Sequence, residues 1–410
     1  MISTNNLSVN DYDYPLPEHM IAQFPLEQRD ASKLLIWKND LLSEDKFSNI
    51  GDHLPEDSIL VFNDTKVIRA RILFPKTTGA LIEIFCLEPI APVKDIQTAF
   101  SMKGHSTWVC LIGNVKRWRS GPIEKKIGIE GSIYMLAAEK KENLGNGCFS
   151  VEFSWQPESL AFSEILEIAG LVPLPPYINR PSEEKDRLAY QTVYAKYDGS
   201  VAAPTAGLHF TRSLLEKLNE KPVLFSHVTL HVGLGTFRPV SSPDISKHVM
   251  HEEKISVPIS MIEQMIRNPE RPVIAVGTTT VRTLESLYWL GVKLIVDSEP
   301  DFPVIYQWDP YNPAYNIGIP LNVALSKVVN RLKSYNLDHF SGNTQVMILP
   351  GYEFKVINGM ITNFHLPKST LLILIAAFAG ISWKDMYDYA LQHEFRFLSY
   401  GDACFLLKAK

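Results

Sequence analysis

Short β-prone segments recur between Val67 and Phe153, and they constrain the fold more than any other feature of the chain. Turns that contain Gly, Pro or Asn separate them, with little helical periodicity in between. The segments read RARILF, ALIEIFCLE, TWVCLIG, GSIYMLAA and CFSVEF. Short strands at regular spacing are typical of a small antiparallel β-barrel or sandwich.

The C-terminal flank of this region has a different pattern, in which strands and helices alternate. Arg271–Val276 is expected to be a buried strand, followed by a helix at Thr280–Leu290. Met347–Leu349 and Phe354–Ile357 are further expected strands, and Ser369–Phe378 is an expected buried helix. This alternation predicts a layered α/β domain with a mixed sheet.

The two patterns together predict a domain organisation. We expect residues 1–66 and 154–410 to form a discontinuous α/β domain that carries the functional site. We expect residues 67–153 to form an inserted small antiparallel β-barrel domain. Residues 297–336 show little periodicity and are expected to be a surface insertion, within a longer stretch, 287–349, whose role stays open.

Composition limits the class of protein. The hydrophobic fraction of 46% and the charged fraction of 21% are those of a globular chain. The net charge of -5 argues against a strongly basic nucleic-acid coat but leaves a local basic groove possible. The four cysteines lack C-x-x-C spacing, and the N-terminus lacks the features of a signal peptide. We expect a cytoplasmic protein with no membrane span.

Ala202–Thr211, which reads AAPTAGLHFT, is the segment most suggestive of a binding site. Small residues such as Gly207 let the backbone approach a ligand closely. Thr205 supplies a hydroxyl and His209 a titratable ring. The alternative is a tight turn into a helix that Thr211 caps, and both interpretations can hold at once.

A strand with two histidines, His227 and His231, leads into a glycine-rich turn that contains Gly233, Gly235 and Arg238. Side chains four residues apart on a strand face the same side, roughly 13 Å apart, so the two histidines cannot share one metal ion. A strand followed by such a turn is a common ligand-binding arrangement, although G-x-G alone is a weak signal. Two purely structural histidines are the alternative.

His248, His251 and Glu252 form a third polar group. On a helix, histidines three residues apart with a nearby carboxylate could bind a metal. The H-E-x-x-H spacing is absent, so we favour a polar pair that faces a substrate and expect no metal site. A metal-dependent hydrolase stays open as the alternative function.

Polar residues also follow the later strands. Gly277, Thr278, Thr279 and Thr280 open a helix that contains Arg282, and exposed amides there suit a carboxylate, phosphate or sugar. The alternative is a threonine-capped helix, since the segment matches neither a Walker loop nor G-x-G-x-x-G. Two further polar segments precede and follow the last helices, and they hold Asn363, His365, Lys368 and Asp402.

Lys116, Arg117, Trp118 and Arg119 lie within the predicted barrel. Basic residues beside an aromatic ring suit phosphate contact and base stacking. A solvated β-turn is the alternative for this segment, and a non-catalytic RNA-binding module is a second alternative function for the chain.

Taken together, these segments resemble the S-adenosylmethionine:tRNA ribosyltransferase-isomerase family of queuosine biosynthesis. The resemblance covers nearly the whole chain, in the family's order. The matching stretches are Tyr12–Leu35, Val61–Arg71, Pro173–Arg180, Tyr190–Thr211, Val228–Val240, His248–Glu252, Val276–Ser286, Pro350–Gly351, Ile361–Thr370 and Arg396–Asp402.

The resemblance implies an α/β domain with an inserted β-barrel. It also implies an enzyme that consumes S-adenosylmethionine as a ribosyl donor and holds no permanent cofactor. The ribosyl unit would pass to 7-aminomethyl-7-deazaguanine at the wobble position of tRNA and rearrange to an epoxycyclopentane. Epoxyqueuosine-tRNA, adenine and methionine would be the products, and a monomer is the simplest expectation.

This chemistry suggests roles for particular residues. The sulfonium acidifies the 5′-carbon, so a base must remove that proton, and an acid must help adenine to leave. We expect His209 and His231 as the leading acid and base, without assigning which is which. Arg282 with the Gly277–Thr280 turn would hold the methionine carboxylate, and Asp198 or Asp402 an ammonium or ribose hydroxyl.

We expect the pocket to have five walls: Ala202–Thr211 and residues 231–238, 277–282, 362–370 and 399–402. The chain departs from the resembled family in three places. Phe24 and Phe395 stand where other members often have Thr and Tyr, and the stretch between Ser286 and Pro350 is longer. The change at Phe395 puts any role of a hydroxyl there in doubt.

Overall fold

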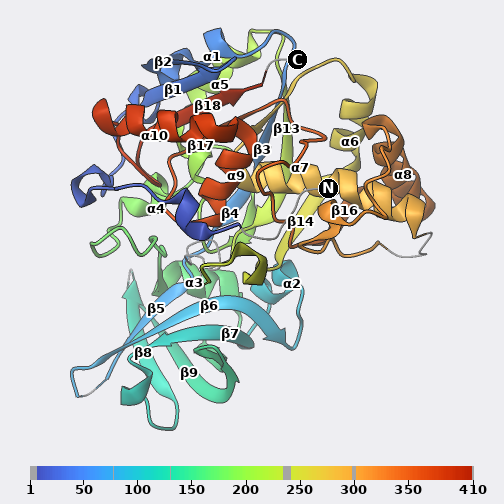
Figure 1. Cartoon of the computed structure of the whole chain (residues 1–410). Helices are drawn as coiled ribbons and strands as arrows, with labels where there is room; N and C mark the ends of the chain where they lie inside the picture. Colours follow the sequence, from blue (N-terminus) through green and yellow to red (C-terminus); the bar gives the residue numbers. More distant parts are fainter. Residues whose placement is uncertain (1–6, 77, 130, 234–241, 298–301, 409–410) are drawn as a thin grey trace.

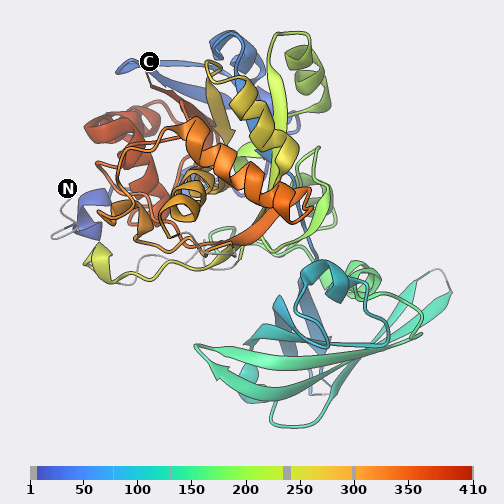
Figure 2. The same cartoon turned by 90° about the vertical axis from the view of Figure 1, so that its right-hand side faces the viewer.

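The chain folds into two lobes of different architecture (Figures 1 and 2). The computed structural model describes residues 7–76, 78–129, 131–233, 242–297 and 302–408. The larger lobe contains both ends of the described chain and most of its described helices, and the smaller lobe, cyan in Figure 1, is nearly all β-strand.

Nine strands of the described chain form the sheet of the larger lobe, in the order β16-β14-β13-β3-β15-β17-β18-β1-β2. The four central strands, from β13 to β17, are mutually parallel, and antiparallel pairs flank them on both sides. The strands are β1 (Lys33–Lys38), β2 (Leu41–Lys46), β3 (Ile59–Asn63), β13 (Leu224–His231), β14 (Glu253–Pro258), β15 (Val273–Val276), β16 (His339–Thr344), β17 (Gly359–Asn363) and β18 (Ala403–Leu407). The predicted α/β class with a mixed sheet is therefore confirmed.

Helices cover both faces of this sheet, and alternate residues of β3 show it. Ile59 and Val61 belong to one buried cluster, whereas Leu60 and Phe62 belong to another. A strand covered on both faces needs a continuous apolar run, which explains the sequence ILVFN. The helices are α1 (Ile50–His53), α4 (Asp186–Ala189), α5 (Arg212–Asn219), α6 (Ile259–Arg267), α7 (Thr278–Val296), α8 (Leu321–Ser334), α9 (Thr370–Ala379) and α10 (Trp383–Gln392).

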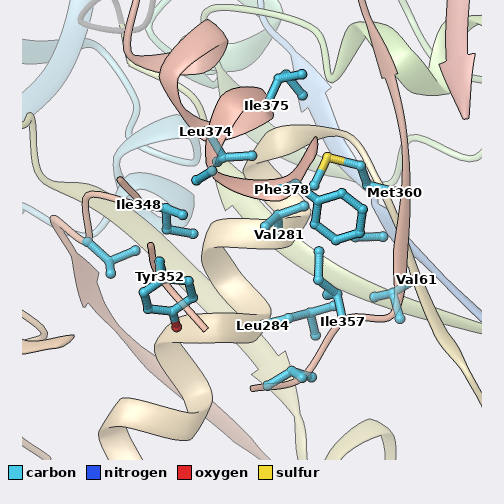
Figure 3. Packing of buried hydrophobic residues seen from close by; sticks show 14 of the residues in the cluster. Val61, Val281, Leu284, Ile348, Tyr352, Ile357, Met360, Leu374, Ile375 and Phe378 are labelled. Atoms are coloured by element: carbon cyan, nitrogen blue, oxygen red, sulfur yellow. The ribbon is translucent and has the colours of Figure 1, made fainter. Parts of the chain in front are cut away.

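The long helix α7 lies at the centre of the larger core. Its residues from Thr278 to Leu294 are all buried. Figure 3 shows Val281 and Leu284 of α7 close to Val61 of β3 and to Phe378 of α9. Because α7 is fixed along its length, its N-terminus is held rigidly against the sheet.

The smaller lobe contains a curved antiparallel sheet of seven strands, in the order β11-β5-β6-β7-β10-β9-β8. They are β5 (Arg71–Pro75), β6 (Leu81–Ala91), β7 (His105–Gly113), β8 (Ile123–Ile129), β9 (Ser132–Gly145), β10 (Cys148–Gln156) and β11 (Gly170–Leu171), with helices α2 (Ile96–Phe100) and α3 (Phe162–Ala169). The expected strands are confirmed. The backbone pairs of the described residues do not close this sheet into a barrel, so the barrel and the domain boundaries at 66/67 and 153/154 stay predictions.

The two lobes are joined by a small parallel pair, β4 (Thr65–Val67) and β12 (Tyr197–Ser200). β4 follows β3 directly, and β12 leads into the segment after Ser200. The connection therefore lies next to the ends of the central strands.

Two expected strands are wrong. Met347–Leu349 and Phe354–Ile357 are irregular, although both segments are buried or nearly so. Their apolar side chains pack against α7, as Ile348 and Ile357 do in Figure 3. The backbone N–H groups of Val356 and Ile357 donate to the carboxylate of Glu285, at 3.0 and 3.2 Å, and not to a neighbouring strand.

The expectation of an irregular surface insertion at residues 297–336 is also wrong in part. It contains the 14-residue helix α8, whose Leu325 and Val328 are buried in the larger core. Residues 298–301 lie outside the described part of the chain.

Thr370–Gln392, which comprises α9 and α10, is long and apolar enough to cross a membrane by length and composition only. Of its most apolar window, 61% is buried inside the protein. A core helix meets the same criterion, so this is weak support for a membrane span.

Candidate active site

A cleft opens at the edge of the large sheet where the parallel central strands end. The carboxyl ends of parallel strands meet at one edge, and ligands of open α/β sheets bind there. The segments after β12, β13, β15 and β17 supply most of its walls. The cleft is lined by Tyr177, residues 202–206, Val232, residues 277–279, residues 362–366, Ser369, Leu371, Leu398 and Ser399. Each of the five predicted segments contributes at least one residue.

The N-terminus of α7 faces this cleft. Gly277 adopts a φ of +93°, which favours glycine, and Thr278 and Thr279 follow it at the cleft wall. Asn63 donates a hydrogen bond from Nδ2 to Thr279 Oγ1 at 3.4 Å. A helix N-terminus offers free N–H groups and a partial positive charge, so this wall suits an anionic group.

Asn363, at the end of β17, forms part of the cleft wall and is only 3% exposed. Its Nδ2 lies 3.2 Å from the carbonyl oxygen of Leu398 and 3.1 Å from His209 Nε2. Leu398 has a φ of +69°, an unfavourable backbone conformation for a residue with a side chain. Such strain is often found at functional sites, and here it aims the carbonyl at Asn363.

His209 lies behind the cleft and does not line it. It belongs to η6 (Thr205–His209), is 4% exposed, and lines a small rear pocket with Arg29, Ser32 and Arg396. Its Nδ1 is 2.8 Å from Ser32 Oγ. Burial, with a further contribution from Arg396, lowers the pKa of His209 to about 3, so the ring is neutral near pH 7.

His231 lies on another side of β13, in what we call the groove. The groove is lined by Asp64, Asp95, Ile96, Gln97, Tyr194, Lys196, Tyr197, His227, Thr229, His231, Lys254, Ser256, Pro258, Asp338, His339 and Ser341. His227 and His231 share it, as the strand pattern predicts. Val232 faces the cleft, because successive residues of a strand point to opposite sides. Burial, then Lys254, lowers the pKa of His231 to about 4.

His365 is the histidine that lines the cleft. Its Nε2 is 2.9 Å from Thr362 Oγ1, and its backbone N–H donates to Tyr387 Oη at 3.0 Å. Burial lowers the pKa of His365 to about 3. The cleft therefore presents a neutral imidazole whose ring is fixed by a threonine hydroxyl.

Several predicted ionic residues are held in ion pairs elsewhere and do not line the cleft. Arg282 is buried and pairs with Glu253 at 2.5 Å, so its placement does not favour the expected contact with a methionine carboxylate. The other pairs are Asp198 with Lys66 at 3.0 Å, Asp402 with Arg396 at 3.0 Å, and Lys368 with Asp13 at 2.9 Å.

The glycines of the predicted site have different roles. A Cβ on Gly207 would lie 1.9 Å from Tyr194 Oη, so packing against Tyr194 requires glycine there. Gly233 does not line the cleft, and a Cβ added to it would meet open space. Gly235 and Arg238 lie outside the described residues.

The third polar group is not helical. His248 ends η8 (Ile245–Lys247), and His251 and Glu252 follow in irregular chain, with Glu252 accepting a hydrogen bond from Asn343. In the described part of the chain, no group of three or more His, Cys, Asp or Glu residues is arranged to hold a metal ion. The metal-dependent hydrolase therefore finds no support.

The basic segment of the smaller lobe is only partly exposed. Lys116, Arg117 and Arg119 are on the surface, whereas Trp118 is 1% exposed and donates from its indole N–H to the carbonyl of Gly121 at 2.9 Å. The placement of Trp118 does not fit the predicted stacking on a base.

The sequence interpretation missed one polar residue of the cleft, Tyr177, which pairs with Ser399 of the predicted 399–402 wall. Tyr177 Oη and Ser399 Oγ are 2.6 Å apart, and Ser399 also borders the rear pocket of His209. Burial raises the pKa of Tyr177 to about 12, so it stays a hydroxyl. The ordered, proline-rich character of Val172–Arg180 was the available signal for a functional loop.

The family model described as queuosine biosynthesis protein matches residues 9–406. The S-adenosylmethionine:tRNA ribosyltransferase-isomerase of Trichlorobacter lovleyi is 38% identical over 97% of this chain and 99% of its own. The protein of the same name from a Sulfurihydrogenibium species is 37% identical over 98% of this chain and 100% of its own.

Among solved structures, the S-adenosylmethionine tRNA ribosyltransferase of Thermotoga maritima is 27% identical. It covers 97% of this chain and 100% of its own, with a TM-score of 0.46. On the family match and the full-length relatives, the chain belongs to the family of queuosine biosynthesis proteins.

Proposed function

We propose that the chain is an S-adenosylmethionine:tRNA ribosyltransferase-isomerase. It transfers and isomerises the ribosyl part of S-adenosylmethionine onto 7-aminomethyl-7-deazaguanine at the tRNA wobble position. The products are epoxyqueuosine-tRNA, adenine and methionine. The observation that carries the proposal is the similarity to relatives of that name over the full length of both chains.

The chemistry of the cleft supports S-adenosylmethionine as its ligand. Among the described residues that line it, none is Asp, Glu, Lys or Arg. Walls of Ala203, Val232, Leu366 and similar residues suit an uncharged nucleoside. The N-terminus of α7 at Thr278 suits the methionine carboxylate. We propose Thr205, Gly277, Thr278, Thr279, Asn363 and His365 as contacts of this substrate.

We propose His365 as the side chain that exchanges a proton with the bound substrate. It lines the cleft, and its low pKa keeps it an acceptor near neutral pH. His209 lacks access to the cleft, and His231 faces the groove. His251, Glu252, Gly233, Gly235 and Arg238 stay predicted contacts without further support.

The tRNA is proposed to contact the smaller lobe, which we propose to be the inserted barrel domain of residues 67–153. Exposed Lys116, Arg117 and Arg119 supply charge for phosphate contacts. We further propose a cytoplasmic monomer that holds no permanent cofactor.

The test mixes the protein, S-adenosylmethionine and a tRNA that carries the aminomethyl-deazaguanine base. Chromatography should detect free adenine, and mass spectrometry of the digested tRNA should detect epoxyqueuosine. The matched control is the same tRNA with guanine at the wobble position, which should release no adenine. Absence of adenine with the modified tRNA under all conditions would remove the proposal.

A further inference from the structure

One buried polar atom of the cleft wall has no partner. Among the described residues that line the cleft, the buried side-chain atom left without a hydrogen bond is Oδ1 of Asn363. Buried acceptors are nearly always satisfied in folded proteins. An unsatisfied acceptor at the wall of a binding cleft therefore points to a ligand that donates a hydrogen bond.

The neighbours of Asn363 determine which end of its amide is left without a partner. The carbonyl oxygen of Leu398 can only accept, so the amide atom 3.2 Å from it must be the NH₂ group. The second hydrogen of that group is directed to His209 Nε2 at 3.1 Å. Both donors of Asn363 are thereby used inside the protein, and Oδ1 is left as a buried acceptor without a partner.

The same contacts fix the tautomer of His209. Because Nε2 accepts from Asn363, the ring proton is on Nδ1 and is donated to Ser32 Oγ at 2.8 Å. The imidazole packs against Phe47, with ring centroids 4.9 Å apart, so it cannot turn freely. Protonation of Nε2 would remove the acceptor and release the amide of Asn363.

We propose that Asn363 Oδ1 accepts a hydrogen bond from the exocyclic amino group of a purine-type base in the cleft, and that His209 is the positioning residue that holds the amide in this orientation. The inference rests on the proposed function and deepens it. Because both donors of this amide are already used, its free acceptor favours an amino group and disfavours a carbonyl at the same place. The apolar walls Ala203, Val232 and Leu366 suit the ring itself.

Two substrates carry such an amino group: the adenine of S-adenosylmethionine and the deazaguanine of the tRNA. The first experimental arm measures calorimetric affinities for S-adenosylmethionine and for S-inosylmethionine, which has a carbonyl in place of the 6-amino group. The second arm measures the affinity for tRNA with the modified base. Neither arm requires turnover, so a failure of the proposed reaction stays distinguishable from a failure of this inference.

We expect the wild-type protein to prefer the adenosyl ligand by about tenfold or more. Asn363→Leu should abolish this preference, because it removes the acceptor. His209→Phe keeps the ring against Phe47 but removes the acceptor for the amide, so it should reduce the preference. His209→Gln, whose side-chain oxygen can accept, should restore it in part. The control His393→Gln, at an exposed position, should behave as wild type.

If the wild-type protein shows no preference, but Asn363→Leu weakens binding of the modified tRNA about tenfold at unchanged affinity for S-adenosylmethionine, the amino group is that of the deazaguanine. No effect of Asn363→Leu in either arm overturns the inference. A preference unchanged in folded His209→Phe overturns the positioning role of His209. If His209→Phe does not fold, the positioning role of His209 is tested by the other two variants. The preference should then be retained in His209→Gln and lost in Asn363→Leu.

Discussion

The cleft and the groove lie on different sides of the end of β13, and their linings differ in charge. The cleft has no Asp, Glu, Lys or Arg among its described lining residues. The groove contains Asp64, Asp95, Lys196 and Lys254 beside His227 and His231. Hydroxyls, an amide and one imidazole can recognise a neutral nucleoside without the cost of burying a charge. The difference teaches that polar residues along the chain do not by themselves show which of the two sites they line.

The largest expected effect separates the histidine of the cleft from that of the groove. His365→Ala should lower kcat/KM for adenine release by about a hundredfold or more, because it removes the imidazole nearest the substrate. His231→Ala is the matched variant and should have a much smaller effect. If His231→Ala were the more damaging change, the reacting groups would lie in the groove.

The second effect is a loss of protein stability in acid, caused by His365 at the cleft and His209 behind it. Their pKa values of about 3, against an ordinary 6.5, mean that the unfolded chain binds protons that the folded chain does not. The contribution of these two neutral histidines to the free energy of unfolding should therefore be complete above pH 6.5. It should fall by about 1.4 kcal/mol per pH unit for each histidine as the pH drops from 6.5 toward 3.

Urea unfolding at several pH values between about 7.5 and 5 measures this slope. His209→Gln should flatten it by the share of one histidine. An identical slope in His209→Gln would mean that His209 is not held neutral.

The third effect tests whether Gly207 serves packing or substrate. Gly207→Ala should cost about 1–3 kcal/mol of stability, since the new Cβ would overlap Tyr194 Oη. Adding Tyr194→Phe removes that hydroxyl and should recover part of the loss. Thermal unfolding of the single and double variants measures it. A fully stable Gly207→Ala protein with lost S-adenosylmethionine affinity would return Gly207 to the substrate contacts.

The smallest effect concerns Asp198, which pairs with Lys66 at a partly exposed site outside the cleft. Asp198→Asn should change the free energy of unfolding by less than about 1 kcal/mol and leave adenine release nearly unchanged. A large loss of turnover in a stable Asp198→Asn protein would show that the reacting groups extend beyond the cleft.

The sequence predicts which segments meet at the cleft better than which side chains face it. Gly277 follows β15 and Asn363 ends β17, which are parallel strands of the large sheet, and the ends of parallel strands converge by topology. The orientation of His231 and Val232 depends on strand register, where a shift of one residue exchanges the two faces. No local pattern fixes that register.

Contacts between residues distant in sequence were the other limit on what the sequence could predict. Arg282 forms an ion pair with Glu253, and His209 forms hydrogen bonds with Ser32 and Asn363. Each of these partners is distant in sequence. The irregular segment that contains Val356 resembled a strand because most of its residues are apolar, and the carboxylate of Glu285 takes the place of a strand partner. A side chain that replaces a strand partner in this way is a result of tertiary packing and not of β-propensity.

The most direct measurement is the crystal structure of the protein with S-adenosylmethionine bound. We predict the adenine ring in the cleft, its amino nitrogen about 3 Å from Asn363 Oδ1, and the methionine carboxylate at the N-terminus of α7. Density for the nucleoside in the groove beside His231, with an empty cleft, would contradict the account.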